Sequence, residues 1–252
     1  MAFGPRWSLG YANTAMSLTD APDAQARLSR FIDTAVPPRC ADQCLSLRLG
    51  LQQHRQTALR LHLESEQVSR SEALVRKFSR GGHPARRQHQ ALPARRSPGV
   101  RGGQRCAGAS SVNSGTGGPC VGQFWDGEGA HIDFTHPAGI AWWQRSLQRQ
   151  LLDYGITSAG TTTTNTRSGT RTAQSHGFGT PIPIARSRPL HALLMTRATH
   201  RGAGRRYAPD ERVFTVTRAG PAGHQRYAQT WVGDNTTSWH TLALEPSHGA
   251  HR

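Results

Sequence analysis

The sequence is poor in hydrophobic residues and has no long hydrophobic run. Hydrophobic types, glycine not counted, make up 35% of its 252 residues, against roughly 45–50% apolar content in an average globular domain on a slightly different residue set that includes glycine. No segment approaches the ~20 consecutive apolar residues of a transmembrane helix, which excludes a membrane-spanning protein and predicts no membrane partner. Met1–Gly10 lacks a charged start followed by an apolar run. We therefore expect no signal peptide and a cytoplasmic protein.

Cysteine is also scarce, with 4 residues in the chain. Four cysteines in a chain of this length do not form the disulfide framework of a small secreted domain. Cys40 and Cys44, with His54 and His62 after them, lack the ligand spacing of a zinc site, so we expect no metal. Asn113–Pro119 is rich in glycine but lacks the Lys-Ser/Thr of a phosphate-binding loop.

Acidic residues are few, and 15 of them against 31 Lys and Arg give a formal net charge of +16. Such a charge is typical of nucleic-acid-binding proteins. Much of it lies in Arg70–Arg105, where Arg alternates with Gly, Pro, His and Gln and no aromatic residue follows Phe78 for a base to stack on. We interpret this stretch as a solvated, disordered linker and do not expect nucleic acid as a partner. An RNA-binding protein that uses the stretch stays open as an alternative.

Pro5–Asp33 has the pattern of folded protein. The segment "TDAPDAQARLSRFID" within it predicts an amphipathic helix with Ala24, Leu28, Phe31 and Ile32 near one face.

The first of two longer regions with this pattern is 118–159. Ile132–Phe134 is strand-like, Thr135 or His136 can cap a helix that has proline in its first turn, and Gly155 ends that helix. One face of the helix is expected to carry Trp142, Leu147, Leu151 and Tyr154.

The second such region is 173–244. It contains a long helix through Leu190–Ala198, a strand with alternating Val213, Thr215 and Thr217, and a further helix capped by Thr236 or Thr237. The alternation of strands and helices is the unit of a (β/α) barrel. Two segments without periodicity, 40–117 and 160–172, are expected to be irregular or disordered.

A candidate site follows the strands of the second region. One strand delivers Arg218, and a second strand-like piece delivers Trp231 three residues before Asp234. A carboxylate at the carboxyl end of a barrel strand lies where such barrels keep catalytic groups. Trp offers an apolar face to a sugar ring, and a partly desolvated carboxyl group keeps its proton near neutral pH and can act as a general acid. From the residues alone, Asp234 as the cap of the next helix stays open.

Four blocks of the sequence resemble glycoside hydrolase family 31, the α-glucosidase and α-xylosidase family. They occur in family order, make up 82 of the 252 residues, and read "PRWSLGYANTAM", "FWDGEGAHIDFTHPAGIAWW", "HGFGTPIPIARSRPLHALLMTRAT" and "TRAGPAGHQRYAQTWVGDNTTSWHTL". The resemblance implies that residues 1–252 are part of an α/β fold, a partial (β/α)8 TIM barrel without a cofactor. It implies hydrolysis of an α-glucoside or α-xyloside by a retaining mechanism with two carboxylates. Asp234 would be the acid/base, and Arg218 and Trp231 would line the sugar subsite.

The sequence departs from the family at the second carboxylate. The nucleophile should follow Gly155-Ile156 in a pattern resembling W-x-D-x-N-E, and the aspartate of that pattern falls on Thr162. A threonine hydroxyl with no base arranged for it is a poor nucleophile. We therefore expect this chain to be inactive. A catalytically inactive barrel that still binds carbohydrate through Arg218 and Trp231 stays open as an alternative.

A displaced reading frame explains the departure. Threonine codons are ACN, so "GTTTTNTRSGT" can be encoded such that a neighbouring frame reads W-N-D-N-N-E-Y-E-I-W-D, which resembles the missing motif. "HPARRQHQALPARRSPG" likewise hides a plausible family strand. We infer that frameshifts produced the irregular segments, whereas 118–159 and 173–244 keep the family pattern. Loss of strands in a barrel leaves sheet edges unpaired, so marginal folding is expected.

Overall fold

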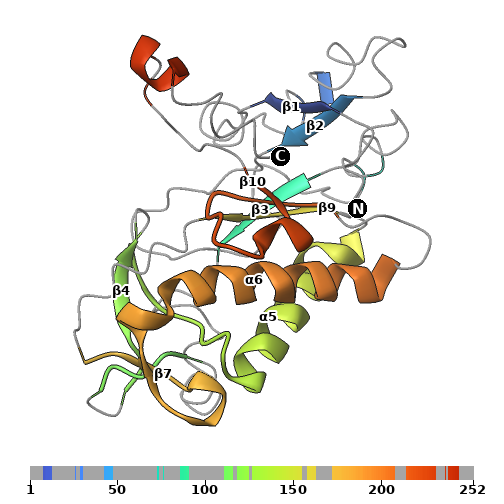
Figure 1. The fold of residues 1–252 in the computed structure, drawn as a ribbon. Coiled ribbons are helices and arrows are strands. Elements are labelled where there is room, and N and C mark those ends of the chain that lie inside the picture. Colours follow the sequence, from blue (N-terminus) through green and yellow to red (C-terminus); the bar gives the residue numbers. More distant parts are fainter. Residues whose placement is uncertain are drawn as a thin grey trace.

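A computed structural model gives the fold of part of the chain (Figure 1). It describes residues 8–12, 26, 29–30, 43–47, 73, 76, 86–90, 111–115, 118–124, 127–154, 158–162, 172–207, 214–230, 236 and 238–243. Everything said below about structure refers to these residues. The helical residues Ala26, Ser29 and Arg30 lie in the segment for which the sequence predicts the first amphipathic helix.

Parallel strands form the centre of the fold. β1 pairs with β2, and four further strands form a sheet in the order β10-β9-β6-β3. Parallel strands that follow one another along the chain are therefore neighbours in each sheet. β2 contacts β3 across the gap between the two groups. The bounds are β1 Ser8–Ala12, β2 Gln43–Leu47, β3 Arg86–Gln90, β6 Ser158–Thr162, β9 Phe214–Thr217 and β10 Gln229–Thr230. A (β/α)8 barrel has eight such strands, and the described residues supply six in succession, which confirms a partial barrel.

Two of these strands and the end of a third lie where the sequence predicts irregular backbone. β2 and β3 lie within 40–117, and β6 extends into 160–172. β3 has the sequence RRQHQ, which contains no apolar residue. The physical reason for the difference is that a parallel ladder joins backbone N–H and C=O groups, and strand formation depends strongly on the neighbouring strands. Here β3 pairs residue by residue with β6, from Arg86 opposite Ser158 to Gln90 opposite Thr162.

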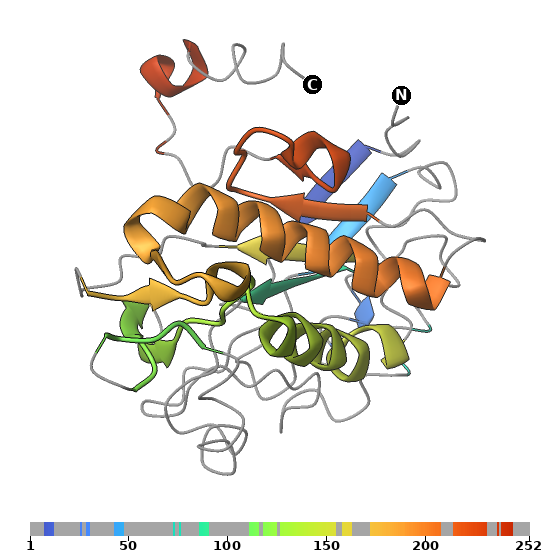
Figure 2. The same ribbon diagram turned by 60° about the horizontal axis from the view of Figure 1, so that its bottom comes forward.

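Two long helices, α5 (Pro137–Gln150) and α6 (Ile184–Tyr207), pack side by side and cover the sheet (Figure 2). α6 contacts both β6 and β9. It extends well beyond the predicted Leu190–Ala198 at both ends. No helix in the described part of the chain has the length and apolar character needed to cross a bilayer.

The start of α5 confirms the predicted cap, but the end differs. His136 has extended backbone angles, and its Nδ1 accepts a hydrogen bond of 3.0 Å from the Ala138 N–H, with Pro137 as the first helical residue. The helix ends at Gln150, five residues before the predicted Gly155. The Leu151 N–H closes the last turn on the Leu147 carbonyl, and the 3-10 helix η1 (Leu152–Tyr154) follows.

The buried face of α5 differs from the prediction at one position: Trp143 is buried in place of the predicted Trp142. Trp143, Leu147 and Leu151 are fully buried, whereas Trp142 is only half-buried. These residues are spaced i, i+4 and i+8, which is the helical repeat. Trp143 can be buried because its indole N–H donates to the Thr199 Oγ1 of α6 at 2.8 Å, which satisfies its polar group.

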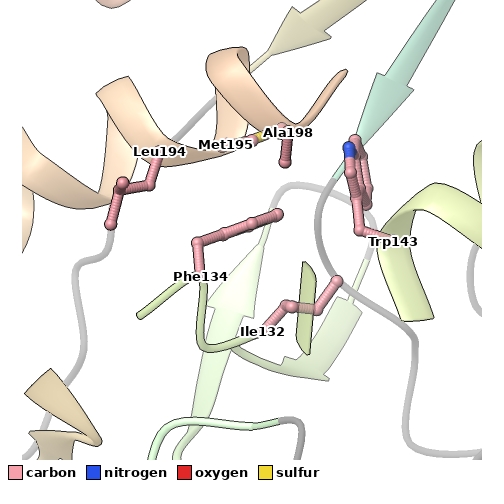
Figure 3. Close-up of a cluster of buried hydrophobic side chains, with 6 residues drawn as sticks. All are labelled: Ile132, Phe134, Trp143, Leu194, Met195 and Ala198. Atoms are coloured by element: carbon pink, nitrogen blue, oxygen red, sulfur yellow. The ribbon is translucent and has the colours of Figure 1, made fainter. Parts of the chain in front are cut away.

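The main cluster of buried hydrophobic side chains joins the two helices (Figure 3). Phe134 lies in its middle and meets Trp143 edge to face, with ring centroids 5.6 Å apart. Phe134, three residues before the start of α5, therefore packs directly on the two helices. The members are Ile132, Phe134, Trp143, Leu194, Met195 and Ala198.

A second cluster lies where two small antiparallel ribbons meet. The hairpin β4 (Val121–Phe124) and β5 (Gly127–Ala130) precedes α5, and the pair β7 (Gln174–Ser175) and β8 (Ile182–Pro183) precedes α6. The 3-10 helix η2 (Gly177–Gly179) connects β7 to β8. The buried members are Val112, Cys120, Ala173 and Ile184.

Candidate active site at the carboxyl ends of the strands

Two of the predicted site residues lie at the carboxyl ends of neighbouring strands. Thr162 is the last residue of β6, and Arg218 directly follows β9. The two strands are parallel, and Thr161 is opposite Thr217, so Thr162 and Arg218 are each one residue beyond the same pair. The sheet therefore brings together two positions that are 56 residues apart in the sequence.

The other two predicted site residues, Trp231 and Asp234, lie outside the described residues. Their strand, β10, ends at Thr230, which is opposite Thr217 of β9. Trp231 follows Thr230 in the chain, so β10 is the third neighbouring strand to end at this edge of the sheet. In (β/α)8 barrels the catalytic residues follow the carboxyl ends of several different strands.

The turn after β9 fixes the backbone at Arg218. Thr217 is buried, and its Oγ1 accepts a hydrogen bond of 3.3 Å from the Ala219 N–H, while Arg218 itself is exposed. Two residues later the chain passes close to the end of β10. A Cβ atom on Gly220 would lie 3.3 Å from the Thr230 Cγ2, so a residue without a side chain suits this approach.

The rest of the β9–β10 connection contains the 3-10 helix η3 (His224–Arg226) and packs on α6. Gly223 has φ +85°, and its carbonyl accepts a hydrogen bond of 3.2 Å from the Arg226 Nε. The Arg226 guanidinium lies 5.4 Å from the centre of the Tyr227 ring, and that ring lies 5.9 Å from the His200 ring of α6. These contacts hold the segment that leads into β10.

A buried carboxylate organises the connection between β6 and α6. Asp133 accepts hydrogen bonds from the Thr135 N–H and Oγ1 at 2.8 and 2.6 Å, and from the His176 N–H at 2.6 Å. The Thr135 Oγ1 in turn accepts from the Gly177 N–H at 2.8 Å. The segment before α5 is thus tied to the segment before α6. The sequence pattern places Asp133 in the strand-like Ile132–Phe134, but its partner His176, 43 residues away, has no sequence signal.

Buried histidines are a further feature of this part of the fold. Burial and, to a smaller extent, the charge of the neighbouring His191 together lower the pKa of His131 to about 4. Burial also lowers the pKa of His191, whose Nε2 lies 2.8 Å from the Ile132 carbonyl oxygen. The His131 Nε2 and His191 Nδ1 are buried without a hydrogen-bond partner. Protonating either histidine would place a positive charge in a buried site away from water, which is energetically unfavourable.

These histidines predict a loss of stability in mild acid. Their folded pKa values lie below the unfolded value of 6.5, so the stability they contribute is present above pH 6.5 and is lost as the pH falls toward 4. His131 alone should cost about 2 kcal/mol between pH 7.5 and 5. Urea unfolding at these two pH values measures the effect, and the loss should shrink in His131→Gln. Equal stability at both pH values would contradict the prediction.

Within the described residues, no three His, Cys, Asp or Glu side chains gather as a metal ion would require.

Similarity to known proteins extends along the chain. A model of the glycosyl hydrolases family 31 TIM-barrel domain matches residues 1–251. Alpha-glucosidase 2 of Bacillus thermoamyloliquefaciens is 29% identical over 129 residues, which are 49% of this chain and 16% of that protein. An alpha-glucosidase of Saccharolobus solfataricus is 39% identical over 67 residues, which are 27% of this chain and 9% of that protein. The chain therefore spans less than a fifth of these relatives.

Solved structures share the fold. A GH31 alpha-xylosidase from a soil metagenome, complexed with xylose, superposes with a TM-score of 0.72 and 13% identity over 93% of this chain and 32% of the other. The Flavobacterium johnsoniae GH31 dextranase, complexed with glucose, gives a TM-score of 0.69 and 18% identity over 93% of this chain and 28% of the other.

Proposed function

Because the chain belongs to glycosyl hydrolase family 31, we propose that it carries the sugar-binding and proton-donating half of a retaining α-glycosidase site and binds α-glucosides or α-xylosides without hydrolysing them. The observation that carries the proposal is the alignment of three strand ends. β6, β9 and β10 end next to one another. Thr162 is the last residue of β6, and Arg218 and Trp231 directly follow β9 and β10 in the chain.

Each residue has a role that its chemistry supports. Trp231 offers an apolar ring on which a sugar can stack. Arg218 is always charged and donates several hydrogen bonds in a fixed plane, which suits the hydroxyl groups of a sugar. Asp234 would donate a proton to the glycosidic oxygen, provided that its surroundings keep it protonated near neutral pH.

The second carboxylate of the mechanism has no counterpart at Thr162. A retaining enzyme needs a nucleophilic carboxylate about 5–5.5 Å from the acid, because the first step forms a covalent bond to the anomeric carbon. A neutral hydroxyl has to lose its proton before it attacks, and the sequence offers no base arranged for it. The proposal is therefore binding without turnover.

The test combines an activity assay with a binding assay on the purified chain. We expect no detectable release of nitrophenol from 4-nitrophenyl α-glucoside or α-xyloside. We expect binding of methyl α-glucoside or methyl α-xyloside, followed by calorimetry, and at least about tenfold weaker binding by Arg218→Gln.

Arg201→Gln is the matched control, because Arg201 is an exposed arginine in α6. Nitrophenol release by the parent chain that is abolished in Asp234→Asn would contradict the proposed inactivity. Binding that is unchanged in Arg218→Gln would contradict the proposed sugar site.

A further inference from the structure

The connection between β7 and β8 holds an aromatic residue in an unfavourable backbone conformation. Phe178 has φ 61° and ψ 29°, and it is the one residue other than glycine with positive φ among the described residues. The left-handed region is disfavoured for a bulky side chain. Phe178 is nevertheless 58% exposed. Burial of the ring therefore does not explain why phenylalanine occupies this position.

The surrounding structure imposes this conformation. The residues on both sides, Gly177 and Gly179, also have positive φ, at 59° and 111°. The Gly177 N–H donates to Thr135, and the His176 N–H donates to the buried Asp133. A Cβ atom on Gly177 would lie 2.7 Å from the Ile182 Cγ1, so the turn is folded tightly on β8. Strain that is held in this way is found at ligand-binding positions.

The exposed residues of the β7–β8 hairpin that carries Phe178 are uncharged. In the β7–β8 pair, Gln174 lies opposite Pro183 and both are exposed, whereas Ser175 on the other face is buried. Thr180 and Pro181 in the turn are exposed as well. Residues 172–183 contain no Asp, Glu, Lys or Arg, in a chain with a net charge of +16. A neutral ligand suits such a surface better than an anion does.

We propose that the Phe178 surface, defined as Phe178, Gln174, Thr180, Pro181 and Pro183, binds an α-glucan chain outside the candidate active site. This inference rests on the proposed function, since it takes the same class of sugar. An exposed aromatic ring can stack on the C–H face of a sugar ring, and the amide of Gln174 and the hydroxyl of Thr180 can bond its hydroxyl groups. The surface lies on the connection from the carboxyl end of β6 to α6, on the side where barrel loops bind substrates.

Native gel electrophoresis in the presence and absence of dextran tests the proposal. Dextran should retard the parent chain. The apparent dissociation constant for dextran, obtained from the retardation, should be about tenfold higher for Phe178→Gly than for the parent. Glycine relieves the left-handed conformation, so the thermal midpoint of Phe178→Gly should not fall. Phe178→Trp should keep the retardation. Trp239→Ala, which removes another exposed ring, is the matched control and should behave as the parent.

The two sites can be separated in the same experiment. Arg218→Gln should keep the Phe178-dependent retardation even if it loses methyl α-glucoside, so failure of one site does not imply failure of the other. Equal retardation of the parent and Phe178→Gly would overturn the proposal. It would also be overturned if Phe178→Gly changed only the oligomeric state in gel filtration, because the surface would then bind a second copy.

Discussion

Replacing Thr162 with aspartate is expected to create hydrolysis of 4-nitrophenyl α-glucoside or α-xyloside where the parent chain shows none. Thr162 ends β6 next to the position of Arg218, at the edge of the sheet where Trp231 and Asp234 follow β10. A carboxylate at this position supplies the nucleophile of the retaining mechanism. We expect a rise in rate of at least about 10³-fold over background, since nucleophiles of hydrolases contribute that much or more.

Two controls separate nucleophilic catalysis from a general effect of charge. Thr162→Asn has nearly the shape of aspartate without its charge and should stay inactive. Thr162→Asp combined with Asp234→Asn should lose most of the gained rate for the nitrophenyl substrate. If Thr162→Asp and Thr162→Asn are equally inactive while both still bind methyl α-glucoside, Thr162 is not the position of the nucleophile.

Replacing Trp143 with alanine is expected to abolish cooperative unfolding of the chain. Trp143 is fully buried, contacts Phe134 edge to face and bonds Thr199 of α6. Truncation of a buried Trp to Ala costs roughly 3–5 kcal/mol, and a whole domain is stable by only about 5–15 kcal/mol. The sheet described here has unpaired edges, so its margin should be small.

Circular dichroism during thermal or urea unfolding measures this effect. Trp239→Ala is the matched control, because the Trp239 side chain is 86% exposed, and its effect should stay within about 0.5 kcal/mol. Similar unfolding curves for the two variants would show that the α5–α6 interface does not stabilise the fold.

The sequence predicts the elements whose signals are local. His136 and Pro137 mark the start of α5, and Thr215 and Thr217 alternate on the buried face of β9. Both predictions are confirmed, because capping and strand alternation involve residues close together in the chain. The cap of the last helical segment at 239–243 is Ser238, whose Oγ accepts from the Thr241 N–H at 3.1 Å, not the predicted Thr236 or Thr237. Several hydroxyl residues in a row leave this choice open in the sequence.

The candidate site, too, is predicted in part by the sequence and in part decided by the tertiary structure. The type and the order of residues in the sequence mark four positions, and the family resemblance gives them roles. These are Thr162, Arg218, Trp231 and Asp234. The structure adds that the carboxyl ends of β6, β9 and β10 are neighbours. For Trp231 and Asp234, the roles stay predictions, because both residues lie outside the described part of the chain.

By itself, the sequence determined the helix start at His136, the alternating strand before Arg218 and the order of the family blocks. Each depends on neighbours a few residues apart. Only the tertiary structure decided that RRQHQ forms β3, that Trp143 rather than Trp142 is buried, and that Asp133 holds the turn at Phe178. These outcomes depend on partners roughly 40 to 70 residues away, and pairing and burial at that range leave no periodic signal in the chain.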